Sequence, residues 1–206
     1  MKKLVVAFVV ILVIFALYKL KYPTYTYHYR MTVEVDAGGE IRSGSSVIEV
    51  NARRQPQLLP EIGPFERWAR GQAVFVPLPG GKNIVGLLAS GARGENADYP
   101  IRIIHRVFNV GDVERLPTLH GRRELAADQM PTLATVTDPD DGASTLVVKP
   151  EALSGLLGVR LRSIEIEMTT DPTTAPDIQA HLPFLVDECK NTLEMGFPRC
   201  SYFVRR

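Results

Sequence analysis

Hydrophobic residues at the start of the chain form one continuous run. Residues 4–18, LVVAFVVILVIFALY, include no charged residue, and lysines lie on both sides of them. Fifteen helical residues rise about 22 Å, which is less than the roughly 30 Å of a bilayer core, but flanking lysines can extend toward the headgroups. The run therefore predicts an N-terminal transmembrane helix that contacts the lipid bilayer through residues 4–18.

Two other interpretations of this run stay open. A cleaved signal peptide has the same charge and length, but it needs small residues before the cut, and neither ALY at 16–18 nor TYT at 24–26 provides them. A buried core helix is the second alternative, although such a helix is rarely apolar on all sides. Because a short basic segment before a first apolar helix usually stays in the cytoplasm, we expect the rest of the chain on the outer side.

A strict alternation follows the apolar run. From Tyr25 to Val35 every second residue is Tyr, Met or Val, and the residues between them are polar. This period of two is typical of a half-buried strand, and the turn residues DAGGE after it predict a β-hairpin. In the returning segment, RSGSSVIEV, the apolar residues change face near Val47, which predicts a β-bulge there.

Similar patterns recur along the chain. The segments at 72–78 and 83–88, and those at 132–137 and 145–149, predict two further hairpins. VRLRSIEIEM predicts a strand with a bulge between Ser163 and Ile164, while FERWAR, PEALSGLLG and DPTTAPDIQAHLPFL predict short helices. PIRIIHRVF fits either a helix or a strand. We therefore expect an α+β, β-rich fold with a membrane anchor at 1–22 and one compact globular domain at 23–206.

Several of these segments carry a resemblance. RSGSSVIEV, QAVFVPLPGGKNIVGLL, MPTLATVTDPDD, VRLRSIEIEMTTDP and LPFL resemble segments of an uncharacterised proteobacterial family of single-span, membrane-anchored proteins. The family has no assigned activity. The resemblance implies a bacterial envelope setting. Together with the apolar run and its flanking charges, it predicts a protein that crosses the bacterial inner membrane once, with the C-terminal domain in the periplasm.

Composition narrows the function classes. The 206 residues are 45% hydrophobic and carry a net charge of only +1. A core of ordinary size is therefore expected, and nothing in the charge supports binding to nucleic acid, which requires many cations.

Ser45 and Ser46 are the candidates for a catalytic nucleophile. A reactive serine usually occupies a strained turn such as GxSxG or has a base beside it, and SGSS lies within a strand pattern without either. We interpret these serines as small packing residues. His28, His105, His120 and His181 show no metal-ligand spacing.

Acidic residues give a second candidate site. Asp138, Asp140 and Asp141 precede a glycine as in calcium loops, but position twelve from Asp138 is Lys149 rather than glutamate. An Asp/Gly turn explains the segment better. Glu165 and Glu167 share one face of their strand, where we expect cross-strand charge pairing rather than acid–base chemistry.

The only two cysteines are Cys189 and Cys200. Outside the cytoplasm they can form a disulfide that stabilises the fold by about 3 kcal/mol. Their spacing matches neither a redox dyad nor a zinc site.

Together these observations predict a membrane-anchored envelope protein that binds or assembles another protein, without enzymatic activity and without a cofactor. Two alternatives remain. One is an exported serine hydrolase that uses Ser45 or Ser46. The other is a module that binds calcium or a small ligand at Asp138–Gly142.

Overall fold

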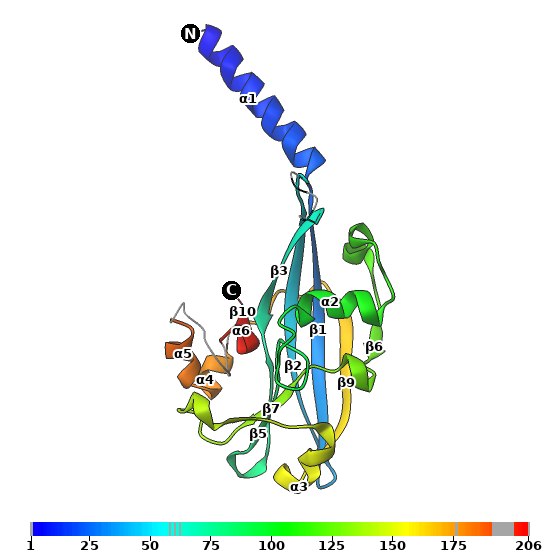
Figure 1. Ribbon diagram of the computed structural model, residues 1–206, viewed down its shortest axis with the longest axis vertical. Coiled ribbons are helices and arrows are strands. Elements are labelled where there is room, and N and C mark those ends of the chain that lie inside the picture. The colour runs from blue at the N-terminus through cyan, green and yellow to red at the C-terminus, as the bar shows by residue number, and fades with distance from the viewer. Residues whose placement is uncertain are drawn as a thin grey trace.

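The computed structural model describes residues 2–57, 59, 61, 63–175, 177–190 and 200–205, and the side chains of all of these except 2–7, 9 and 14. It shows a β-rich α+β domain with two antiparallel sheets and a few short helices, as the sequence predicts. Figure 1 shows the long strands side by side, with α2 across them and α1 pointing away from the domain.

The larger sheet has six strands in the order β10-β3-β2-β1-β9-β6. Its strands are β1 (Thr24–Ala37), β2 (Glu40–Arg54), β3 (Phe65–Gln72), β6 (Arg122–Glu124), β9 (Arg160–Thr169) and β10 (Val204–Arg205). The smaller sheet, in the order β4-β5-β7-β8, contains β4 (Val74–Pro77), β5 (Asn83–Gly86), β7 (Leu133–Val136) and β8 (Thr145–Val147). Both predicted short hairpins are confirmed by the pairing of β4 with β5 and of β7 with β8.

The described helices are α1 (Lys2–Lys21), α2 (Tyr99–Val107), α3 (Leu153–Leu157), α4 (Ile178–His181), α5 (Phe184–Glu188) and α6 (Cys200–Phe203). One apolar cluster joins the large sheet to α2 and to the near side of the small sheet. A second cluster joins the far side of the small sheet to α4, α5 and α6. The domain therefore has three layers, and Figure 1 shows α4 and α5 to one side of β5 and β7.

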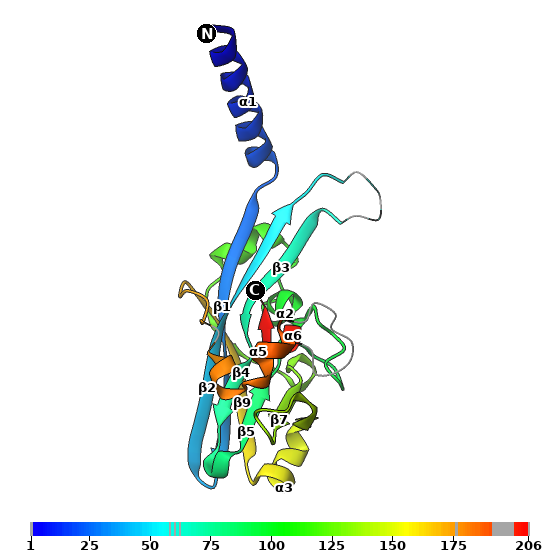
Figure 2. The same cartoon turned by 90° about the vertical axis from the view of Figure 1, so that its left-hand side faces the viewer.

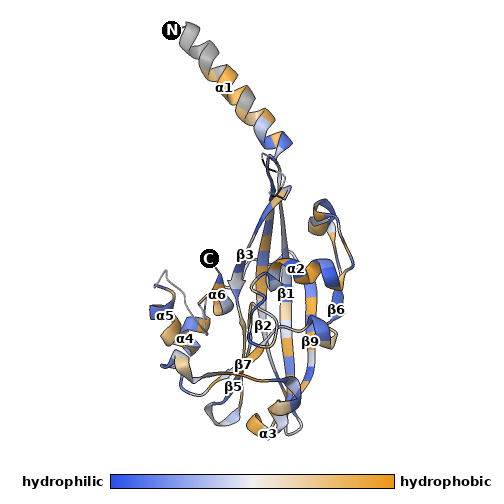
Figure 3. Cartoon of the chain, in the orientation of Figure 1, coloured by the Kyte–Doolittle hydropathy of each residue, from blue (hydrophilic) through white to orange (hydrophobic). Residues whose placement is uncertain are grey.

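The two faces of the large sheet have opposite character. The inner face, toward α2 and the small sheet, carries Tyr27, Tyr29, Met31, Val33 and Val35, each at most 4% exposed. The outer face carries the polar residues between them. Figure 3 shows this alternation along β1 and β9 as changes of colour from residue to residue. The strand predicted at Tyr25–Val35 and the turn at Gly38 and Gly39, both with positive φ, are confirmed.

Two buried tyrosines attach α2 to the inner face. The hydroxyl of Tyr29 donates to the carbonyl of Pro100 at 3.1 Å, and that of Tyr27 donates to the carbonyl of Ile101 at 3.4 Å. Both carbonyls belong to the first turn of α2. PIRIIHRVF, whose sequence fits either a helix or a strand, therefore forms a helix that is hydrogen-bonded to β1.

A glycine in SGSS lets the two sheets meet. Gly44 lies on the inner face opposite Val33, directly beneath β4. A Cβ at this position would stand 2.1 Å from the backbone carbonyl oxygen of Phe75. Because no residue with a side chain fits there, Gly44 sets the separation of β2 and β4.

Two sequence predictions are wrong in their details. The pairing of β1 with β2 runs from Thr24↔Arg53 to Ala37↔Glu40 without a shift, so there is no bulge near Val47. Val47 is buried on the outer face because Thr174 exchanges two hydrogen bonds with its backbone. In β9 the bulge is real, but its extra residue is Arg162, slightly before the predicted place.

The predicted helix at FERWAR is also wrong. These residues begin β3, which pairs with β2 from Arg54↔Phe65 to Glu49↔Arg70. The hydrogen bonds that β2 offers override a weak local pattern. The short helix predicted at 150–158 and the one after Asp177 are confirmed as α3 and α4.

The helix α1 stands apart from the domain (Figures 1 and 2). Its described large apolar side chains are exposed on all sides, between 50% for Val10 and 78% for Leu20. In the part of the chain that the structure describes, no helix combines the length and apolar character needed to cross a membrane. Only Tyr22 and Pro23 separate α1 from β1.

Candidate functional site: a polar groove on the outer sheet face

The outer face of the large sheet collects polar side chains from four strands. Register places Ser45 opposite Thr32, and Thr32 opposite Glu165. One step along, Arg30 lies opposite Glu167, which in turn lies opposite Arg122 of β6. Residues more than a hundred positions apart in sequence thus become neighbours through strand pairing.

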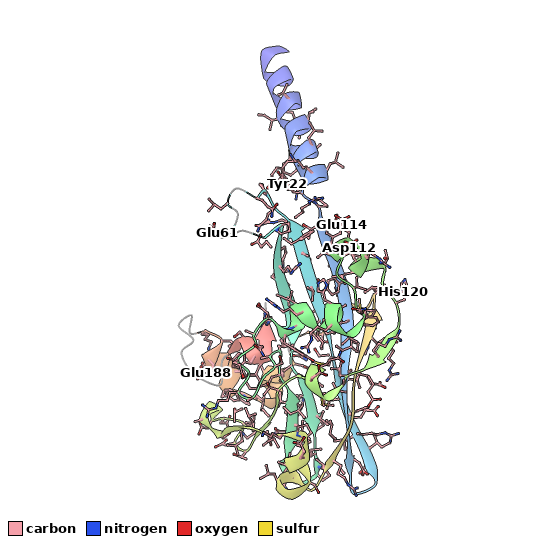
Figure 4. All side chains as sticks on the ribbon, turned by 45° about the vertical axis from the view of Figure 1, so that its right-hand side comes forward. Tyr22, Glu61, Asp112, Glu114, His120 and Glu188 are labelled. Carbon is pink, nitrogen blue, oxygen red and sulfur yellow. A yellow bond between two sulfur atoms is a disulfide. The ribbon has the colours of Figure 1, made fainter. Side chains whose placement is uncertain are left out.

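Two adjoining hollows occupy this face. The first has a volume of about 510 Å³ and includes Arg30, Ser45, Arg122, Glu167 and Asp171 in its lining. The second, of about 380 Å³, includes His28, His120 and Thr169. Thr169 borders both, and we refer to the two adjoining hollows together as the polar groove. Figure 4 shows His120 on the loop that borders it, beyond the edge of the strands.

Two arginines and a histidine that line the groove are paired with carboxylates. Arg122 donates from Nε to Glu165 Oε2 at 2.6 Å, and Arg30 donates to Asp171. Nε2 of His28 lies 3.3 Å from Oε2 of Glu49. The hydroxyl of Thr169 and the guanidinium of Arg30 lower the pKa of the Asp171 carboxyl below its usual value. These contacts fix the directions of the side chains, and the lowered pKa keeps the Asp171 carboxyl ionised rather than poised for proton transfer.

The two serines of SGSS lie on opposite sides of the sheet. Ser46 faces the core and is 1% exposed, and its hydroxyl has no hydrogen-bond partner among the described residues. Ser45 lines the groove. Its cross-strand neighbour Thr32 is four residues from His28, which is roughly 13 Å along a strand. No hydrogen bond joins Ser45 to a histidine in the described chain, so the geometry provides no serine–base pair.

The acidic turn is built as its sequence suggests. The backbone N–H of Asp140 donates to Asp138 Oδ1 at 3.1 Å, and the N–H of Ala143 donates to Asp141 Oδ1 at 2.9 Å. These carboxylates support the turn instead of converging on one point. Among the described residues, no group of three or more His, Cys, Asp or Glu side chains is placed to bind a metal ion.

The remaining histidines and the cysteines lie away from the groove. Nδ1 of His105 lies 2.7 Å from the carbonyl oxygen of Val110, and the ring of His181 stacks on Phe75 with centroids 4.6 Å apart. Cys189 and Cys200 form a disulfide that joins α5 to α6, with Cα atoms 5.2 Å apart. It ties together elements of the second apolar cluster.

Sequence reasoning missed the arginines and Asp171 in the groove. It placed Glu165 and Glu167 on one strand face, which the structure confirms. Arg30 occupies a polar position of β1 and Arg122 follows a histidine and a glycine, which are ordinary contexts for surface charge. The signal that could have identified them is the strand order β1-β9-β6, which no local pattern contains.

Comparison with known proteins provides no further guide to the site. No family model matches the chain, and no similar curated protein or solved structure is found.

Proposed function

We propose that this protein is a membrane-anchored module of the bacterial envelope that binds another protein through its outer sheet face. In this proposal α1 enters the inner membrane, the domain lies on the periplasmic side, and the polar groove receives the partner. The observation that carries the proposal is the groove itself, in which paired charges from β1, β6 and β9 surround an open hollow without a serine–base pair.

The chemistry of the groove favours a protein partner. Fixed pairs of opposite charge around a hollow present donors and acceptors in defined directions, which gives specificity for a complementary polar surface. The arginines already satisfy carboxylates, so a small anion would have to displace them. The polar groups of a protein surface can instead form further hydrogen bonds to these pairs and leave both partners in place.

Membrane attachment is supported by α1 and by the sequence that forms it. Its described large apolar side chains are at least 50% exposed, and the run at 4–18 includes further apolar residues whose side chains lie outside the described set. Burial of such a surface in lipid is strongly favourable. The short junction at Tyr22 and Pro23 then keeps the groove close to the bilayer, and this tether raises the effective concentration of a membrane partner.

The attachment is tested by fractionation of cells that express the full chain. We expect the protein to remain in membranes washed with alkaline carbonate. Replacing Val10 and Val13 together with arginine should release it, because each charge costs about 3 kcal/mol within a bilayer. The matched control replaces the same two residues with leucine. Release of the unaltered chain by a salt wash alone would contradict the proposal.

The binding face is tested by photocrosslinking in intact cells. A photoreactive residue in place of Ser45 should give a discrete protein adduct, and Arg122→Glu should abolish that adduct. The same photoreactive residue in place of Leu156, which is 58% exposed on α3, is the control and should give none. An adduct at Ser45 that persists unchanged in the Arg122→Glu variant would overturn the assignment of this face.

A further inference from the structure

One edge of the large sheet is open along most of β3. On one side β3 pairs with β2 over six residue pairs, from Arg54↔Phe65 to Glu49↔Arg70. On its other side β10 pairs only with Gly71 and Gln72. Within the described residues, no strand pairs with Phe65–Arg70 along this second side.

The hydrogen-bond phase of β3 shows which residues face the open side. Gln55 N–H donates to the carbonyl of Pro64 at 3.0 Å, so the even-numbered residues of β3 exchange hydrogen bonds with β2. The carbonyl of Phe203 accepts from Ala73 N–H at 2.7 Å on the opposite side. By this alternation, Phe65, Arg67 and Ala69 direct their backbone donors and acceptors away from β2. The open edge therefore runs from Phe65 to Ala69, a stretch of five residues that is roughly 17 Å long.

This edge borders a groove rather than a flat surface. A hollow of about 490 Å³ includes Arg67, Trp68 and Ala69 of β3 in its lining, together with Ile101 of α2 and Val204 of β10. Val204 belongs to β10, the strand that already pairs with the end of β3, so the hollow lies beside both strands. An extended chain placed there would continue the ladder that β10 begins.

Charge indicates what kind of chain fits. The side chain of Arg67 is exposed on the inner side of the edge, and no carboxylate among the described residues pairs with it. Its guanidinium instead lies 5.8 Å from the ring centroid of Phe65. Asp98, the acidic residue that lines the hollow, is paired with Arg102 at 3.3 Å. The groove is therefore basic where a new strand would meet Arg67.

From these observations we infer that the edge of β3 binds an extended acidic peptide segment of a partner protein by strand addition. The peptide runs antiparallel to β3, as β10 does, and places a glutamate or aspartate opposite Arg67. Backbone hydrogen bonds to Arg67 and Ala69 provide affinity, and the charge pair provides register. This edge is separate from the outer-face groove, so the inference can be supported or refuted independently of the function proposed above.

The test uses the purified full chain in detergent micelles and the synthetic peptide acetyl-Thr-Val-Glu-Val-Thr-Val-amide. We expect saturable binding, with slower amide hydrogen exchange at Arg67 and Ala69 in the complex. Arg67→Glu should weaken binding about tenfold or more, and a peptide with lysine in place of glutamate should then bind the Arg67→Glu variant better than the unaltered protein.

Two controls separate strand addition from general attraction. Arg70→Glu makes the same change of charge on the same strand, but its side chain projects from the opposite face, so binding should change less than about twofold. A peptide N-methylated at the glutamate keeps its charge and loses a donor to the edge, so it should not bind. Equal binding of the methylated peptide, or no effect of Arg67→Glu, would overturn the inference.

Discussion

The two faces of the large sheet are built from the same strands but are stabilised in different ways. On the inner face, Tyr29, Met31 and Val33 are fully buried, and their neighbours are fixed by packing. On the outer face, Arg30, Thr32 and Glu34 are partly exposed and interact through charge and hydrogen bonds. The inner face is therefore expected to contribute most of the stability of the domain, and the outer face much less.

The strongest test of this difference compares two neighbouring variants: Gly44→Ala on the inner face and Ser45→Ala on the outer face. A methyl group on Gly44 meets the carbonyl of Phe75, so β2 and β4 must separate. We expect Gly44→Ala to lower the free energy of unfolding by about 3 kcal/mol, and Ser45→Ala by less than about 0.5 kcal/mol. Urea denaturation measures both. Similar losses for the two variants would show that the faces do not differ in this way.

A second test uses alkaline pH, which acts on the buried tyrosines of the inner face. Burial raises the pKa of the hydroxyls of Tyr27, Tyr29 and Tyr99 above the ordinary value of 10.0. The unfolded chain ionises near that value while the folded chain stays protonated, so stability is full below pH 10 and falls above it. Thermal melting across this range should show the decline.

The matched variant for the alkaline experiment is Tyr29→Phe. It removes one hydrogen bond to Pro100, which should cost about 1 kcal/mol at neutral pH. It also removes one group that ionises on unfolding, so the decline above pH 10 should become shallower. A decline of unchanged steepness would mean that Tyr29 does not contribute to it.

The smallest effect is expected from Arg122→Gln on the outer face. The side chains of Arg122 and Glu165 are 55% and 24% exposed, and pairs of this kind contribute little to stability. We expect a loss of less than about 1 kcal/mol in urea denaturation and a clear loss of the crosslink at Ser45. A loss as large as that of Gly44→Ala would place Arg122 among the residues that hold the fold.

Local patterns predicted those elements that carry their own periodicity. β1 was evident because eleven residues alternate without interruption from Tyr25 to Val35. The turn at Gly38 and Gly39 was evident because its chemistry is local. In contrast, FERWAR becomes a strand only because β2 lies beside it, and Val47 is buried only because Thr174 covers it.

The candidate site was predictable only in parts, for the same reason. The sequence drew attention to Ser45, His28, His120 and Glu167, and all of them line the groove. It could not separate Ser45 from Ser46, because the change of face near Val47 was interpreted as a bulge. The partners Arg30, Arg122 and Asp171 are joined to these residues by strand order and by a turn after β9, which depend on the whole fold.

The junction between α1 and β1 has a mechanical consequence. β1 begins at Thr24, with two residues between it and the end of α1, and it lies in the middle of the sheet with β2 and β9 as its neighbours. The carbonyl of Pro23 accepts a hydrogen bond from Arg54 N–H at 2.9 Å, so even the junction is fastened to β2. Tension applied through α1 would load both ladders of β1 in shear. Many hydrogen bonds would then have to break together, so the domain should resist being pulled apart in that direction.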